Sequence, residues 1–256
     1  MTWQINQTSK KVKITNPILI EGLPGMGNVG KIAVDFLIDA LAAKKVYEIS
    51  SNTLPHCVFV NEENMVELPE IEVFHKQIGK RSFLFLSGDT QPLDEVSCYE
   101  FCHKVLDTFE KGKGKEIITL GGLGLSKIPE EPKVYCTGNN KSFIQKFIKS
   151  KTVSNEIHGV IGPIVGVSGL LTGLAGKRKI PAVSLLAETF GHPNYLGVKG
   201  AKELLKVLDK EYKLKLDLSE LEEDIDLVGK PMNKKLKKSA KLKTENQAPT
   251  DTNYIG

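Results

Sequence analysis

Residues 17–44 constrain the fold of this chain more than any other stretch. The apolar run at residues 18–20 predicts a strand buried on both faces, because it lacks the alternation of a half-exposed strand. A glycine-rich turn follows, and apolar residues then recur every three to four positions over residues 32–41, which predicts a helix. Asn28 is the predicted N-cap of that helix. A strand, a tight turn and a helix in this order open a βαβ unit.

The turn also fits the dinucleotide-binding pattern G-x-G-x-x-G, through Gly25, Gly27 and Gly30, with Asn28 between the last two. Glycine amides and a helix N-terminus attract pyrophosphate, and Glu48, on the next predicted strand, has the spacing of an acid that binds a ribose hydroxyl. Tight strand-to-helix turns need glycine in any protein, so backbone geometry explains the pattern as well. We predict that the glycines serve geometry. A nucleotide- or phosphate-binding enzyme or sensor is the alternative function.

The composition predicts a body with a packed core and a separate basic end. The chain has 256 residues, of which 40% are hydrophobic. Residues 229–256 hold seven lysines against Glu245 and Asp251, so they carry +5, and the rest of the chain carries −1 of the total of +4. A near-neutral body argues against nucleic acid as a partner, because phosphate neutralisation requires a basic face. The lysine-rich end has few apolar residues and is predicted to be disordered.

The sequence also bears on compartment and metal binding. No apolar stretch reaches the length of a membrane span, and residues 1–14 lack the apolar segment of a signal peptide. The four cysteines are scattered, as in a reducing compartment, so we expect a cytoplasmic protein without membrane contact. Cys98 and Cys102 stand four apart on a predicted helix beside His103, but no second ligand pair follows. We expect core packing there, and no metal or cofactor.

Beyond residue 44, predicted strands alternate with predicted helices. The predicted strands are residues 45–50, 82–86, 115–120, 133–137 and 182–188. The predicted helices are residues 93–111, 141–150, 165–175, 199–208 and 218–227. In the helix at 93–111, Val96 belongs to the predicted apolar face. Residues 53–88 include an antiparallel insertion. The pattern predicts an α/β class protein: a three-layer α/β/α domain with a mainly parallel sheet over residues 1–228, followed by the disordered tail 229–256.

Four predicted loops follow strands whose carboxyl ends would share one edge of the sheet. They are residues 21–30, 87–92, 121–128 and 188–198. Ligand clefts of open α/β sheets lie at this edge, so we expect these loops to meet there.

Three groups at these strand ends are candidates for chemistry. Ser168 with His192 and Asp89 is a candidate triad, but it lacks the second glycine of G-x-S-x-G, so we favour close packing for Ser168. Glu188 and His192 are a candidate acid–base pair, although loop hydrogen bonds explain them more simply. Glu21 and Asp89 are a further candidate pair of carboxylates. The sequence has no P-loop and no complete catalytic set, so we predict that the protein is not an enzyme.

Four motifs in order carry a resemblance: EGLPGMGNVG at residues 21–30, the strand and loop at 83–91, GGLG at 121–124, and the stretch 159–176 that leads to LLAE at 185–188. Together they resemble the proteasome assembly chaperone family, in particular archaeal homologues of the second eukaryotic chaperone subunit. The resemblance runs from about residue 15 to residue 228. It implies a phosphorylase-like α/β/α fold, no established catalysis, a homo-oligomer, and contact with proteasome alpha subunits.

The resemblance also implies a role for the end of the chain. Certain archaeal relatives end in a hydrophobic residue, a tyrosine and one final residue, which dock between alpha subunits. Here the tyrosine is third from last, in Asn253-Tyr254-Ile255-Gly256, and the residue before it is polar. Tyr254, Ile255 and Gly256 are the predicted partner-binding residues, with an inert tail as the alternative. The glycine-rich helix at residues 165–175 is the predicted oligomerisation surface.

Overall fold

The computed structural model describes residues 3–8, 14–154, 162–219 and 221. The chain divides into two units, Met1–Asp217 and Leu218–Gly256, and the description below concerns the first. The predicted tail at residues 229–256 and most of the helix predicted at residues 218–227 lie outside the described residues.

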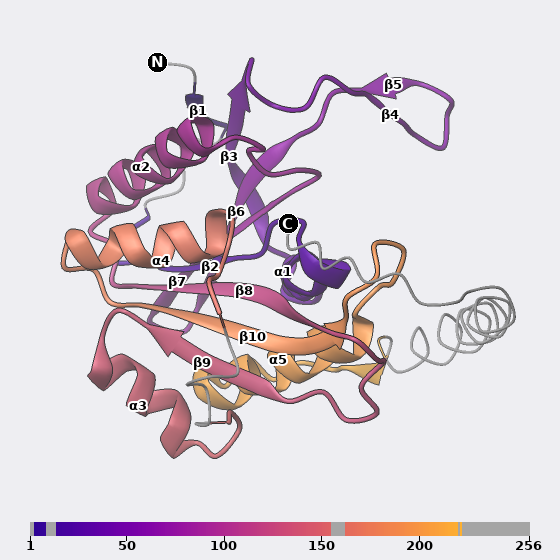
Figure 1. Ribbon diagram of the computed structural model, residues 1–256. Helices are drawn as coiled ribbons and strands as arrows, with labels where there is room; N and C mark the ends of the chain where they lie inside the picture. The colour runs from indigo at the N-terminus through magenta and orange to yellow at the C-terminus, as the bar shows by residue number, and fades with distance from the viewer. Residues whose placement is uncertain (1–2, 9–13, 155–161, 220, 222–256) are drawn as a thin grey trace, which may run out of the picture. The chain divides into compact units, whose positions relative to one another are not determined.

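An eight-stranded sheet forms the centre of the first unit, in the order β1-β3-β6-β7-β2-β8-β10-β9 (Figure 1). The strands are β1 Trp3–Gln7, β2 Ile18–Glu21, β3 Lys44–Ser51, β6 Ile71–Ile78, β7 Arg81–Gly88, β8 Glu116–Leu125, β9 Val134–Gly138 and β10 Ala182–Phe190. The four central strands β7, β2, β8 and β10 run parallel to one another. The pairs outside this centre are antiparallel. The predicted antiparallel insertion is therefore confirmed, and it includes a separate hairpin of β4 Phe59–Val60 and β5 Val66–Glu67.

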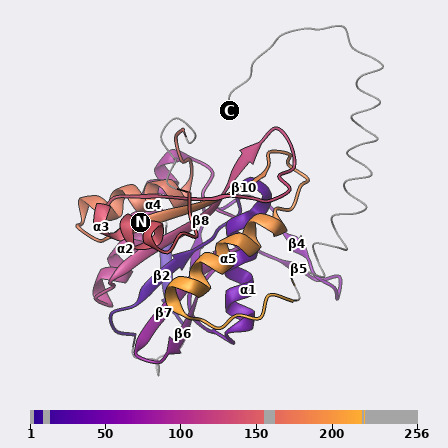
Figure 2. The same ribbon diagram turned by 90° about the horizontal axis from the view of Figure 1, so that it is seen from below.

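Helices cover both faces of the sheet, as Figures 1 and 2 show. They are α1 Val29–Ala40, α2 Glu95–Lys111, α3 Lys141–Lys149, α4 Val167–Lys177 and α5 Val198–Tyr212. α1 packs beside α5 on one face, α2 packs beside α4 on the other, and α3 packs against β9. The predicted three-layer α/β/α architecture is confirmed. Among the described residues, no helix combines the length and the apolar character that crossing a membrane requires.

The core follows from the apolar patterns of these elements. All four residues of β2 are buried, as expected for a strand covered on both faces. On the α2 and α4 side, Trp3 of the edge strand β1 packs edge-on against Phe101 of α2, with ring centroids 4.8 Å apart. The indole of Trp3 also donates a hydrogen bond to the carbonyl of Ser97 at 3.1 Å. The edge strand is thereby fixed to α2 by both packing and a polar contact.

Side chains cap two of the helices at their first turns. The Asp94 carboxylate accepts a hydrogen bond from the backbone of Ser97 at the start of α2, and Asn140 accepts one from Phe143 at the start of α3. Asn28 occupies the N-cap position of α1, but its side chain makes no cap hydrogen bond. Its φ of 51° is left-handed, and the 3-10 turn Met26–Asn28 leads into α1 directly. The predicted N-cap position of Asn28 is therefore confirmed, although its side chain does not cap the helix.

The loop predicted to begin at residue 121 is wrong, because β8 continues through Gly124 to Leu125. Gly121 and Gly122 pair with Leu186 and Ala187 of β10 in the parallel ladder. Glycine is needed there for close approach rather than for a turn. A Cβ atom on Gly122 would lie 2.2 Å from the carbonyl oxygen of Met26.

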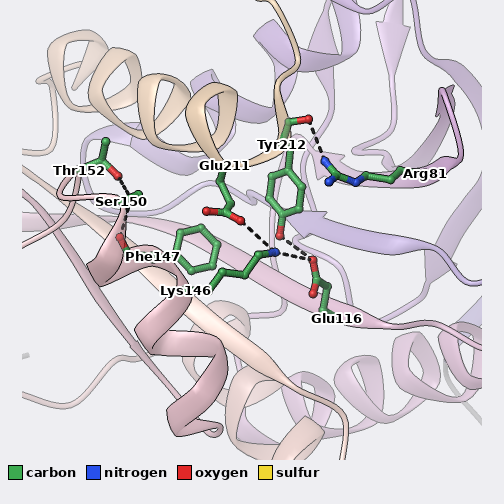
Figure 3. A network of polar contacts seen from close by, with 8 residues as sticks. All are labelled: Arg81, Glu116, Lys146, Phe147, Ser150, Thr152, Glu211 and Tyr212. Atoms are coloured by element: carbon green, nitrogen blue, oxygen red, sulfur yellow. Dashed lines mark hydrogen bonds and ion pairs between the residues drawn. The ribbon is translucent and has the colours of Figure 1, made fainter.

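A polar network ties α3 and α5 to the amino ends of β7 and β8 (Figure 3). The Tyr212 hydroxyl donates to Glu116 at 2.8 Å, and Arg81 donates to the Tyr212 carbonyl at 3.0 Å. Lys146 lies 3.5 Å from Glu116 and 3.1 Å from Glu211. Burial is the largest cause that raises the pKa of Tyr212 well above its ordinary value, so the hydroxyl keeps its proton and remains a donor.

We expect Tyr212→Phe to lower the free energy of unfolding by roughly 1–3 kcal/mol, because Glu116 loses a charge-assisted hydrogen bond in a half-buried site. Denaturant unfolding followed by circular dichroism measures this. Tyr99→Phe is the matched control, since the ring of Tyr99 is exposed on α2, and it should change the value by less than about 0.5 kcal/mol. Equal small effects of the two substitutions would contradict a stabilising role for the network.

Candidate functional site

The loops at the carboxyl ends of the central strands meet over β2. The parallel strands β7 and β8 lie on the two sides of β2. The chain therefore continues from β2 first to one side of the sheet and later to the other, and ligands of open α/β sheets bind where the strand order changes direction in this way. Gln91, after β7, donates from its side-chain amide to the carbonyl of Pro24 at 2.7 Å. The backbone of Gly197, after β10, donates to the carbonyl of Gly27 at 2.7 Å. The predicted meeting is confirmed for the loops at residues 21–30, 87–92 and 188–198.

The glycine-rich turn after β2 is filled by its own chain. Gly27 has a φ of +61°, and a Cβ atom there would lie 2.7 Å from Thr189 Oγ1. Gly30 lies in the first turn of α1, where a Cβ atom would meet the carbonyl oxygen of Leu120 at 2.3 Å. Gly25 is exposed, and its nearest neighbour would be 4.0 Å away. Packing thus accounts for glycine at Gly27 and Gly30, but not at Gly25.

Glu48 does not lie beside this turn. It belongs to β3, which β6 and β7 separate from β2. In the dinucleotide-binding fold the second strand lies directly beside the first, which brings its acid to the ribose. The Glu48 carboxylate instead pairs with Lys45 at 3.0 Å. The turn therefore lacks the acid that the sequence spacing predicts for a ribose site.

Glu21, the last residue of β2, is fully buried. Its carboxylate accepts hydrogen bonds from the backbone of Leu23 at 3.0 Å and from the hydroxyl of Ser168 at 2.9 Å. Burial raises the pKa of Glu21 to about 7, outweighing these two hydrogen bonds, which lower it. The carboxyl group therefore titrates near neutral pH, and it joins the end of the central strand to the first turn of α4.

Gln91 makes a second link to the start of α4. Besides donating to Pro24, its side-chain oxygen accepts a hydrogen bond from the backbone of Val167 at 3.2 Å. Gly166, with a φ of +85°, leaves room for this contact, since a Cβ atom there would lie 2.7 Å from the Gln91 oxygen. One amide side chain thus connects the turn after β2, the loop after β7 and α4.

Beside these links, α2 and α4 border an open groove of about 860 Å³. We call this surface the groove; its lining is mostly apolar and consists of Gln91, Pro92, Leu93, Asp94, Glu95, Cys98, Tyr99, Ile164, Val165, Gly166, Gly169, Leu170, Gly173, Leu174 and Lys177. Leu93 and Val165 are 78% and 86% exposed. An open, apolar surface of this kind suits a polypeptide partner better than a small polar ligand, which binds in enclosed pockets.

Val96 belongs with these exposed side chains, so its predicted place on the buried face of α2 is wrong: it is 70% exposed. Its position five residues before the buried Phe101 explains this, because five residues rotate the side chain by about 140° around the helix axis. Cys98 and Cys102 do lie in the core on the α2 side, as predicted. In the described ranges, no group of three or more histidine, cysteine, aspartate or glutamate side chains could hold a metal ion.

The candidate acid–base pair at the end of β10 makes separate contacts. Glu188 accepts a hydrogen bond from the Tyr135 hydroxyl at 2.8 Å and another from the backbone of Lys133 at 3.0 Å. His192 accepts one from the backbone of Asn194 at 3.2 Å. Loop hydrogen bonds, the simpler explanation from the sequence, account for both side chains.

The candidate triad and the candidate carboxylate pair are not assembled either. Ser168 donates to Glu21, and Asp89 accepts a hydrogen bond from the backbone of Glu70 at 3.1 Å. Besides the close packing predicted for Ser168, its hydroxyl is thus the partner of a buried acid, which the sequence did not indicate. The predicted partner-binding residues Tyr254, Ile255 and Gly256 lie outside the described residues.

Comparison with known proteins gives three informative matches. The sequence model of the PAC2 family matches residues 19–235. The chain is 30% identical to the uncharacterized protein MJ1210 of Methanocaldococcus jannaschii over 227 residues, which cover 87% of this chain and 85% of that protein. The crystal structure of Pyrococcus furiosus PbaB, an archaeal proteasome activator, is 31% identical, with a TM-score of 0.83 over 91% of this chain and 98% of PbaB.

A further similarity concerns the fold alone. Pyrococcus furiosus PbaA, an archaeal homolog of proteasome-assembly chaperone, is 20% identical, with a TM-score of 0.76. The match covers 96% of each chain, so the whole layered architecture is common to both proteins.

Proposed function

This chain belongs to the PAC2 family, and from that premise we propose that it is a non-enzymatic chaperone of proteasome assembly that binds proteasome alpha subunits. The observation that carries the proteasome as partner is the similarity to PbaB, an archaeal proteasome activator, over almost the whole of both chains. The role in assembly is supported by the common fold with PbaA, an archaeal homolog of proteasome-assembly chaperone. The site supports the proposal in a second way. Polar groups at the strand ends, such as Glu21, Gln91 and Glu188, are engaged in hydrogen bonds between structural elements.

We further propose that the protein acts in the cytoplasm as a homo-oligomer. The scattered cysteines support this compartment. The near-neutral charge of the body argues against nucleic acid as a partner. A nucleotide-dependent function has less support, since Thr189 and Leu120 occupy the space beside Gly27 and Gly30. Micromolar binding of NAD or FAD in calorimetry would restore that alternative.

The end of the chain is the proposed docking element for the alpha subunits. Lysines at residues 230–243 favour encounter with acidic grooves, an effect that weakens as the salt concentration rises. Tyr254 is the proposed anchor, because aromatic side chains dominate the affinity of small interfaces. Ile255 packs beside it in this proposal, and the terminal carboxylate of Gly256 meets a lysine of the partner.

We expect Tyr254→Ala to weaken binding to assembled proteasome alpha-rings about tenfold or more, because an anchor side chain is lost. Surface plasmon resonance at low and high salt measures the affinity of the intact chain, Tyr254→Ala and a chain truncated after Gly229. Asn253→Ala is the matched control and should bind like the intact chain. The truncated chain should bind less well still, while its melting temperature stays within a few degrees of the intact value.

Two outcomes would contradict parts of this proposal. Equal binding by all three forms would remove the docking role from the tail and leave any chaperone activity to the folded body. Failure of the intact chain to bind at low salt would contradict the proposed partner itself.

A further inference from the structure

Exposed apolar side chains gather on two separate surfaces of the first unit. Among the described residues, ten of the twelve large exposed apolar side chains belong to these two surfaces. Four lie in or beside the groove: Leu93 before α2, Val96 and Tyr99 on α2, and Val165 before α4. The other six lie on the hairpin of β4 and β5, residues 58–68, which we call the arm. The six are Val58, Phe59, Val60, Met65, Val66 and Leu68.

The arm is a well-formed hairpin. Asn61 closes its turn: its side-chain oxygen accepts a hydrogen bond from the backbone of Met65 at 2.9 Å, and its amide donates to Glu67 at 2.7 Å. Val60 pairs with Val66 across the two strands, so their side chains share one face of the hairpin. Val58 and Leu68, which flank these two strands, are also exposed, at 51% and 73%. Val60 and Val66 therefore form an exposed aliphatic face of the arm.

This aliphatic face has no cover from its own sheet. Figures 1 and 2 show the arm extending from the body on the side away from α2 and α4. Val60 and Val66 are each 66% exposed. An isolated two-stranded hairpin is marginally stable in water and needs a third element against its apolar face. A partner that packs on this face would supply that element.

The groove has the shape and surface to receive such a hairpin. Gly173 lies on α4 in the groove lining, and a Cβ atom there would meet nothing within 4 Å. Packing within the described chain therefore does not require glycine, although glycine in a helix interior is less stable than alanine. A glycine at this position lets the backbone of an incoming strand approach α4 closely. Leu93, Tyr99 and Val165 provide apolar side walls.

The charge at one end of the groove is complementary to the acidic turn of the arm, while the groove acids Asp94 and Glu95 lie at the start of α2. The arm carries Glu62, Glu63 and Glu67, and the sequence has no lysine or arginine between Lys45 and Lys76. Lys177 lies at the C-terminal end of α4 in the groove lining and forms no ion pair within the part of the chain that the structure describes. An arm seated with its acidic turn toward this end of α4 would place Glu62 or Glu63 beside Lys177.

We propose that the arm of one copy of this chain docks in the groove of a second copy. The arm and the groove are different surfaces of the chain, so the contact is heterologous, and a docked pair still offers one free arm and one free groove. Repetition of such a contact closes a ring or continues as a filament. The inference deepens the homo-oligomer part of the proposed function. Its test uses the purified chain alone, so its failure would leave binding to alpha subunits undecided and separately testable.

Two variants and their mixture test this arrangement by sedimentation velocity. The arm variant Val60→Thr/Val66→Thr keeps β-branched side chains but removes apolar surface. The groove variant Gly173→Gln fills the groove with a residue that favours helix. We expect the intact chain to self-associate, and each variant alone to do so at least about tenfold more weakly. Mixed in equal amounts, they should form a 1:1 dimer, because the mixture contains an intact arm and an intact groove.

Each alternative contact predicts a different pattern. Arm-to-arm contact would leave the groove variant associating like the intact chain, and helix-to-helix contact through α4 would leave the arm variant unaffected. Either of these two results would overturn the proposal. An intact chain that stays monomeric would also overturn it, and so would a mixture that forms no dimer. Leu196→Gln, an exposed apolar residue outside both surfaces, is the control and should leave association unchanged.

Charge reversal provides an independent check that leaves the apolar surfaces intact. Lys177→Glu should weaken association, and mixing it with Glu62→Lys/Glu63→Lys should strengthen association relative to either variant alone. Absence of this rescue would contradict the proposed orientation of the arm. Circular dichroism of every variant verifies that the fold is retained.

Discussion

Replacing Gly30 with alanine is expected to lower the free energy of unfolding by about 3–5 kcal/mol. A Cβ atom at this position would lie 2.3 Å from the carbonyl oxygen of Leu120 and 3.4 Å from the Cα atom of Gly22. Both neighbours are backbone atoms, so neither can rotate away as a side chain would. The helix α1 would have to shift from the sheet and lose part of its packing.

Denaturant unfolding followed by fluorescence or circular dichroism measures this effect. Helix propensity alone predicts the opposite sign, because alanine is favoured over glycine in a helix by up to about 1 kcal/mol. Gly25→Ala is the matched control, since the nearest atom would be 4.0 Å away, and it should change stability by less than about 0.5 kcal/mol. A stability of Gly30→Ala equal to or above that of the natural chain would contradict the close seating of α1.

The natural chain should lose roughly 3 kcal/mol of stability relative to Glu21→Gln as the pH rises from 4.5 to 8. Burial raises the pKa of Glu21 from 4.5 to about 7, so the folded chain keeps a proton that the unfolded chain releases. A raised pKa contributes stability that is fully present below the unfolded value and is lost as the pH rises through the folded value. Glutamine does not titrate, so the difference between the two chains isolates this group.

Unfolding curves at intervals of pH measure the difference. Ser168→Ala is a second variant, which keeps Glu21 but removes a hydrogen bond that lowers its pKa. The loss of stability with rising pH should therefore extend to higher pH in this variant. Ser154→Ala, outside this contact, is the control for removing a serine hydroxyl and should leave the pH window in place. A difference between the natural chain and Glu21→Gln that is constant with pH would contradict the raised pKa.

The layered fold was predictable from the sequence because its elements have strong local patterns. The run of apolar residues in β2 and the helical period of α1 each specify their element without reference to the rest of the chain. The ends of elements were less predictable. Gly121 and Gly122 look like turn residues, yet the ladder with β10 continues through them, since a neighbouring strand decides whether a glycine segment is extended.

The polar links of the candidate site were missed for a different reason. Ser168 and Gln91 contact Glu21 and Pro24 across long sequence separations, and no local pattern marks such pairs. The glycine pattern marks the turn at Gly25 to Gly30, but the tight packing of the turn depends on Thr189 and Leu120 of other strands. Sequence reasoning located the loops that meet, and only the tertiary structure shows which side chains join them.

The lack of basic residues in the arm also determines which proteases can act on it. Trypsin cuts after lysine or arginine, and no such residue occurs between Lys45 and Lys76. Trypsin therefore leaves the whole arm within a single peptide. A protease specific for glutamate finds Glu62 and Glu63 in the turn of the hairpin, between its exposed strands. Cleavage at these two residues would open the arm at its tip in the natural sequence, without any substitution.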